Sequence, residues 1–163
     1  MVPEPRGSDA GNGPVGPGLA VVFATVGYLA LVIFGLGLVS LATGEAVIAT
    51  PGLGQVPGIV ATASALVVFA LALWSVVRRS RPSFWNSGWV AAASVLAYLG
   101  GLWIAVLAGG SGIATATAVA GGIVVSWFGV VIAGTALVAA WSGIALVRTR
   151  ARRPRWPWEQ DEE

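Results

Sequence analysis

The feature that most constrains this chain is a set of four long apolar runs without a charged side chain. They cover residues 19–43, 56–77, 84–108 and 118–147. About 20 helical residues cross the ~30 Å hydrocarbon core of a bilayer, and each run reaches that length. The runs are continuous rather than alternating, which favours helices that satisfy their own backbone over barrel strands. We therefore predict an all-α membrane protein, a four-transmembrane-helix bundle.

The composition supports this class. Hydrophobic residues make up 56% of the chain and charged residues only 10%, whereas a soluble domain carries about 25% charged residues. The chain has too few charged side chains to cover a surface that faces water. We therefore expect the outer surface of the bundle to face lipid.

The pattern predicts a transmembrane domain between two polar ends. The expected parts are a disordered cytoplasmic N-terminus at 1–17, a transmembrane domain at 18–147 with helices at about 19–43, 56–77, 84–108 and 120–147, and a basic then acidic cytoplasmic tail at 148–163. The start of the fourth helix has two readings because residues 109–126 contain few large side chains. We expect it near Ala120 with a tilted helix; the alternative is a start near Trp127, after a loop or a short interfacial helix.

The basic residues are all arginine, and eight of the nine lie in two clusters. One cluster lies between the second and third runs and the other follows the fourth: Arg78, Arg79 and Arg81, then Arg148, Arg150, Arg152, Arg153 and Arg155. The connections at 44–55 and 109–117 contain no basic residue, and Glu45 is their only charge. Because positive residues favour the cytoplasmic side, we predict that both clusters and both termini are cytoplasmic. There the clusters should anchor the chain at anionic lipid headgroups.

The two halves of the chain resemble each other weakly. The only two tyrosines, Tyr28 in "TVGYLA" and Tyr98 in "VLAYLG", are 70 residues apart, and "WS" recurs at Trp74 and Trp141, 67 apart. These matches indicate either two parallel helical-hairpin repeats related by an axis along the membrane normal, or chance similarity between apolar helices. The sequence leaves both readings open.

The residues that the chain lacks exclude several kinds of chemistry. It has no Cys and no His, and its only methionine is Met1, so the usual ligands of haem, zinc and copper are missing. We expect no enzyme activity, no cofactor, no metal and no nucleic-acid partner. No charged residue lies in mid-span, where such a residue would suggest ion coupling. Small multidrug exporters need a carboxylate in the first helix, and this chain has none there.

Two function classes remain. The first is an accessory or structural bundle that associates with itself or with another membrane complex. The second is a pore or carrier for a neutral or apolar solute, either holin-like or a small transporter. Small residues allow helices to approach closely in lipid, so Gly129 and Ala133, four residues apart, are candidate helix-packing positions.

Over its whole length the chain resembles uncharacterised small four-span integral membrane proteins of actinobacteria. The resemblance is carried by the composition, the Arg-only basic clusters and the "RPRWPWE" tail at 153–159. It implies a bacterial origin and a multi-pass location in the plasma membrane. It transfers no functional residue to this sequence.

The predicted topology can be tested by cysteine labelling, since the chain has no native Cys. Single cysteines at Gly54 and Ser111 should react with a membrane-impermeant maleimide in whole cells, and cysteines at Ser8 and Ser80 should react only after lysis. Labelling of Ser80→Cys in intact cells, without labelling of the Gly54 or Ser111 variants, would reverse the orientation.

Overall fold

The computed structural model describes residues 16–48, 54–78 and 83–148. They form five helices and, in these ranges, no strand: α1 Pro17–Thr43, α2 Val56–Val77, α3 Trp85–Ala108, α4 Ile113–Val125 and α5 Trp127–Arg148. All but α4 are long and apolar enough to cross a membrane. The predicted fold class is confirmed: the chain is a multi-pass, all-helical membrane protein. Most of the segment predicted to be disordered, 1–17, and all but the first residue of the tail, 148–163, lie outside the described residues.

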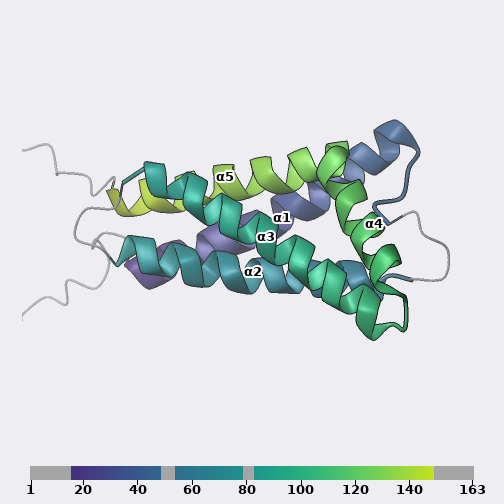
Figure 1. Cartoon of the computed structure of the whole chain (residues 1–163). Coiled ribbons are helices and arrows are strands. Elements are labelled where there is room, and N and C mark those ends of the chain that lie inside the picture. Colours follow the sequence, from purple (N-terminus) through teal and green to yellow (C-terminus); the bar gives the residue numbers. More distant parts are fainter. Residues whose placement is uncertain (1–15, 49–53, 79–82, 149–163) are drawn as a thin grey trace, which may run out of the picture.

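The four long helices run side by side along one axis, and α4 crosses obliquely at one end (Figure 1). α2 packs mainly against α3, and α1 packs mainly against α5; α1 and α2 touch less extensively. The starts of α1 and α3 and the ends of α2 and α5 share one end of the bundle, which we call the Arg78 end. The opposite end, where α1 stops before Glu45, is called the Glu45 end. Arg78 and Arg148 therefore lie at the same end of the bundle, as the predicted topology requires.

The buried positions repeat between the two halves of the bundle. A shift of 70 residues, the spacing of Tyr28 and Tyr98, carries every buried position of α1 onto a buried position of α3: Ala20, Val21, Ala24, Tyr28 and Val32 onto Val90, Ala91, Ser94, Tyr98 and Leu102. A shift of 67 residues, the spacing of the two "WS" pairs, carries six buried positions of α2 onto buried positions of α5. They are Ala61, Ala65, Phe69, Leu73, Val76 and Val77, carried onto Phe128, Ile132, Ala136, Ala140, Gly143 and Ile144. The burial pattern thus supports two parallel hairpins, α1–α2 and α3–α5, rather than chance similarity.

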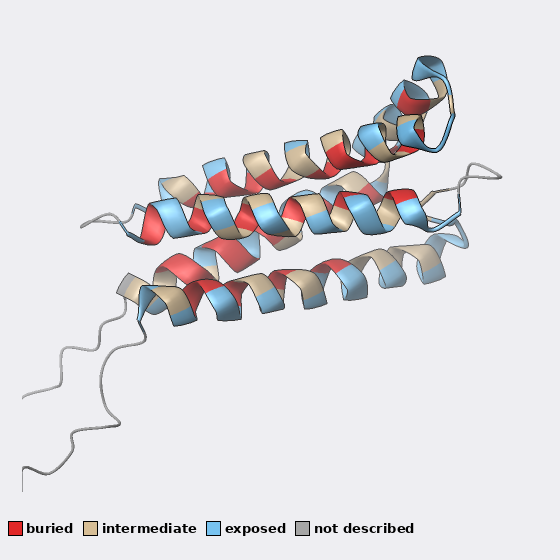
Figure 2. Cartoon of the chain, turned by 90° about the horizontal axis from the view of Figure 1, so that it is seen from below, coloured by how far each residue is buried: buried red, intermediate tan, exposed pale blue. Residues whose placement is uncertain are grey.

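The outward faces of the long helices are apolar. Buried positions face the middle of the bundle and exposed positions face outward (Figure 2). Large side chains such as Ile33, Phe34, Leu71 and Leu96 are more than 60% exposed. Water would oppose such a surface, since soluble proteins rarely expose wide apolar patches. Lipid is the solvent that suits this surface.

Helices α2 and α3 approach each other closely because Gly101 has no side chain. A Cβ atom at Gly101 would lie 3.3 Å from Cα of Ala61 and would collide with the Ser64 hydroxyl. That hydroxyl donates a hydrogen bond to the Ala97 carbonyl across the interface, at 2.8 Å. Close backbone approach and interhelical hydrogen bonds are the main sources of helix affinity in lipid. Gly101 and Ser64 therefore hold the most extensive contact of the bundle.

The prediction of one continuous fourth helix over 120–147 is wrong. The region forms two helices, α4 and α5, which meet at Ser126, whose backbone is extended with φ −98° and ψ 165°. The alternative start near Trp127, after a short helix, matches the structure. The break lets the chain turn from the oblique path of α4 into the bundle axis. The stretch contains no proline, so its sequence allowed both the continuous and the broken helix.

The close approach at Gly101 predicts opposite effects for two neighbouring substitutions. Gly101→Ala should lower the melting temperature of the detergent-solubilised protein, because overpacking costs about 1–3 kcal/mol. Gly100→Ala should leave it unchanged or raise it, because a Cβ at Gly100 meets nothing within 4 Å and Ala favours helix by about 1 kcal/mol. Equal melting temperatures for the two variants would contradict the close packing of α2 on α3.

Candidate functional site

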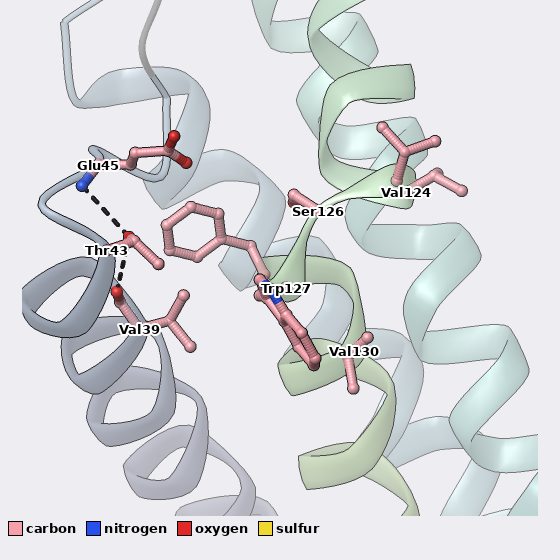
Figure 3. A pocket seen from close by; sticks show the side chains of 9 residues that line it. Val39, Thr43, Glu45, Val124, Ser126, Trp127 and Val130 are labelled. Atoms are coloured by element: carbon pink, nitrogen blue, oxygen red, sulfur yellow. Dashed lines mark hydrogen bonds between the residues drawn. The ribbon is translucent and has the colours of Figure 1, made fainter.

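Three cavities gather at the Glu45 end of the bundle. The first, of about 320 Å³, opens between the end of α1 and the junction of α4 with α5. Figure 3 shows Thr43 and Glu45 on one side of it and Ser126 and Trp127 on the other. The structure thus brings the single acidic residue of its described part next to the helix break.

The turn that carries Glu45 is fixed by hydrogen bonds. Gly44 adopts a left-handed conformation, φ 71°, and its N–H donates to the Ser40 carbonyl at 2.9 Å. Glycine commonly ends a helix in this way because it has no Cβ to oppose positive φ. The Thr43 hydroxyl donates to the Val39 carbonyl at 2.8 Å and accepts from the Glu45 N–H at 3.2 Å. These bonds set the direction in which the chain leaves α1 and place Glu45 at the mouth of the first cavity.

Hydrogen bonds also fix the helix break on the other side of this cavity. The Ile123 carbonyl, near the C-terminus of α4, accepts hydrogen bonds from the Ser126 N–H at 3.3 Å and from the Ser126 hydroxyl at 2.9 Å. The Gly129 N–H donates to the Ser126 carbonyl at 3.1 Å. A Cβ at Gly129 would lie only 2.5 Å from the Ile123 oxygen. The turn between α4 and α5 therefore needs glycine at this position.

The other two cavities lie on either side of the segment 45–48. One, of about 550 Å³, lies between this segment and α4. The other, of about 590 Å³, lies between α1 and α2, with Tyr98 of α3 also in its wall. Ala46, Val47 and Ile48 contribute to both. The segment 45–48 therefore lies between these two cavities at the Glu45 end.

The walls of these cavities offer mainly apolar contacts. They are mostly aliphatic, and the described residues contain no group of three His, Cys, Asp or Glu side chains that could hold a metal. Glu45 is exposed, and among the described residues at this end no hydroxyl donates a hydrogen bond to a carboxylate. Cavities of this kind accept apolar groups and orient them with a few polar atoms.

The predicted topology residues are described only in part. Arg78 ends α2, and its guanidinium carbon lies 5.5 Å from the centre of the Trp74 ring, a cation–π arrangement. Arg148 is the last residue of α5. The other predicted anchors lie outside the described residues: Arg79, Arg81, Arg150, Arg152, Arg153 and Arg155.

The predicted packing pair, Gly129 and Ala133, differs in surroundings, and its proposed contact with a helix of another chain stays a prediction. Gly129 packs against the end of α4, whereas Ala133 is exposed on the outside of α5. At Gly35, Gly101 and Gly143 an added Cβ would come within 3.0 Å of a side chain of another long helix. Nothing in the sequence separated these three from the others, because the chain has 23 glycines.

Comparison with known proteins gives one match. A family model, described as a family of unknown function, matches residues 18–163. No curated protein and no solved structure matches the chain.

The role of Gly129 predicts a change in the geometry of the junction. Spin labels on Ala114→Cys in α4 and Val138→Cys in α5 report the distance between these helices by pulsed electron resonance. Adding Gly129→Ala should shift or broaden this distance distribution, because the new Cβ meets the Ile123 carbonyl. Gly134→Ala is the matched control, since a Cβ there meets nothing within 4 Å. An unchanged distribution with Gly129→Ala would show that the break does not depend on this glycine.

Proposed function

The chain belongs to DUF6121, a family of unknown function, and from that premise we propose that it is a non-catalytic accessory protein of the plasma membrane. In this role the bundle associates with itself or with a larger membrane complex. The observation that carries the proposal is the apolar, hydrogen-bonded interior of the bundle. A protein that moves polar solutes would need a polar path through that interior.

The core supports this role. Among the described residues, the buried polar side chains are Ser87 and Ser94. Each donates a hydrogen bond to its own helix, to the carbonyls of Phe84 and Val90 respectively. Neither hydroxyl therefore has its proton available for a passing solute. Apart from the hydroxyls of Tyr28 and Tyr98, every other side chain of the buried core is apolar.

Four other hydroxyls of the long helices behave in the same way. Thr25, Thr62, Thr135 and Ser142 each donate to the carbonyl four residues earlier. Such bonds satisfy a hydroxyl in lipid without a second polar partner. The helices therefore present aliphatic surfaces both inward and outward, which suits helix–helix association better than conduction.

The two ends of the bundle suit opposite sides of the membrane. Arg78 and Arg148 share one end with Trp74, Trp85 and Trp89, and Arg with Trp is typical of a cytoplasmic interface. In the proposed orientation this end and both termini are cytoplasmic and contact anionic lipid headgroups. The Glu45 end then faces the outside.

The alternative role, a pore or carrier for a neutral or apolar solute, has a direct test. Purified protein in liposomes should not accelerate the flux of neutral solutes such as glycerol or urea above that of empty liposomes. Flux that depends on the protein and is abolished by Thr135→Val or Ser142→Ala would replace the accessory role with transport.

If the bundle associates with another chain, a larger side chain should disrupt that contact only on the helix face that makes it. Ala133 is exposed on α5, and Ala92 is exposed on α3. If the α5 face makes the contact, Ala133→Leu should insert normally but lose the oligomer or the co-purifying partner in mild detergent. Ala92→Leu makes the same change on another helix and should keep it. A strictly monomeric wild-type protein that retains no partner would contradict the accessory role.

A further inference from the structure

The cavity between α1 and α2 has the size and walls of a ligand pocket. Its volume of about 590 Å³ falls in the range of roughly 300–1,000 Å³ typical of small-molecule sites. Its walls are mostly aliphatic, with Ile33 and Leu36 from α1 and Ile59 and Leu66 from α2. It lies between two transmembrane helices, so a molecule dissolved in the bilayer can reach it from the side.

The second hairpin, α3–α5, shows why the first hairpin, α1–α2, contains this space. The shifts that superimpose the buried positions carry Ile33 onto Trp103 and Thr62 onto Gly129. In the second hairpin these two positions contact α4: the Trp103 indole N–H donates to the Thr117 hydroxyl at 3.3 Å, and Gly129 lies against the Ile123 carbonyl. The described residues of the first connection form no counterpart of α4. The cleft therefore corresponds to a space that the second hairpin fills with apolar chain.

Tyr98 supplies the cleft with an unsatisfied polar atom. Its side chain is only 1% exposed and lines the cleft. Its hydroxyl makes no hydrogen bond with any of the described residues. No fully enclosed side-chain nitrogen or oxygen atom of these ranges lacks a partner, so the hydroxyl keeps a small accessible area on the surface of Tyr98. The cleft is the cavity that it borders. A buried tyrosine hydroxyl usually finds a hydrogen-bond partner, and here a ligand can provide it.

The depth of Tyr98 limits what that ligand can be. Tyr98 lies ten residues before Ala108, the end of α3, which corresponds to about 15 Å along a helix. That places the hydroxyl near the middle of a hydrocarbon core of ~30 Å. The ester oxygens and charged headgroup of a phospholipid do not reach this depth, and an ion would be costly there. A neutral, lipid-soluble molecule fits both the walls and the depth.

We propose that the cleft between α1 and α2 binds a neutral lipophilic molecule whose carbonyl oxygen accepts a hydrogen bond from Tyr98. The aliphatic walls hold the hydrocarbon part, and the hydroxyl selects the oxygen. This site does not depend on the association proposed above, because it is complete within one chain.

Photolabelling in nanodiscs tests the site. The probe is a long-chain ketone with a diazirine on its alkyl chain, added to purified protein in phosphatidylcholine nanodiscs. Labelling should saturate, should compete with the unlabelled ketone and should map to the α1 and α2 walls. Tyr98→Phe removes only the hydroxyl and should weaken binding about five- to ten-fold, the effect of one hydrogen bond. Tyr28→Phe is the matched control, because Tyr28 stacks on Phe69 at 4.5 Å and does not line the cleft.

Two further comparisons separate a site from general contact with lipid. Ala63→Trp fills the cleft and should abolish saturable labelling, whereas Val67→Trp, one turn along α2 and outside the cleft, should not. The hydrocarbon analogue without the carbonyl should bind the wild type as weakly as the ketone binds Tyr98→Phe. Labelling that does not saturate, or that spreads along all exposed helix faces, would overturn the proposal. So would equal ketone affinity of the Tyr98→Phe and Tyr28→Phe variants.

Discussion

The structure depends on one constraint: inside a membrane no water is available to satisfy polar groups, so the chain must satisfy them itself. The four long helices do this for the backbone. Hydroxyls along them, such as those of Thr25 and Thr135, donate to carbonyls of the preceding turn. Where α4 ends, at the Glu45 end, a side chain contributes as well: the Ser126 hydroxyl donates a hydrogen bond to the Ile123 carbonyl. Among the described residues, the buried hydroxyls of Tyr28 and Tyr98 are the exceptions, and of the two only Tyr98 lines the cleft.

Because lipid is as apolar as the bundle core, association of these helices relies on close fit more than on hydrophobic exclusion. Gly101 lets α3 approach α2 at Ala61, and Gly143 lets α5 approach Leu73 and Ala24. These contacts link both hairpins, so each hairpin is held mainly by the other rather than by its own two helices. The looser contact of α1 with α2 leaves room for the cleft between them.

The two ends of the bundle differ in what they can do. The Arg78 end holds Arg and exposed Trp and suits headgroups. The Glu45 end holds the helix break, the capped turn after α1 and all three cavities. A duplicated architecture thus carries one asymmetric feature: α4 fills the second hairpin, and the first hairpin remains open to ligands. The proposed ligand binding and the proposed association therefore involve different parts of the same small domain.

The sequence by itself determined the helices that cross the membrane, because four uncharged runs of sufficient length have no other stable form in lipid. It also placed the arginines at common ends of these runs and set the spacings of the two tyrosines and the two "WS" pairs. It could not tell which side of each helix faces inward. Lipid and core are both apolar, so hydropathy carries no period that separates Tyr98 from exposed Leu96. Only the tertiary structure decided which of the 23 glycines lie at helix contacts, where α4 ends, and whether α1 and α2 enclose a cleft. All three features depend on how closely backbones that are distant in sequence approach each other.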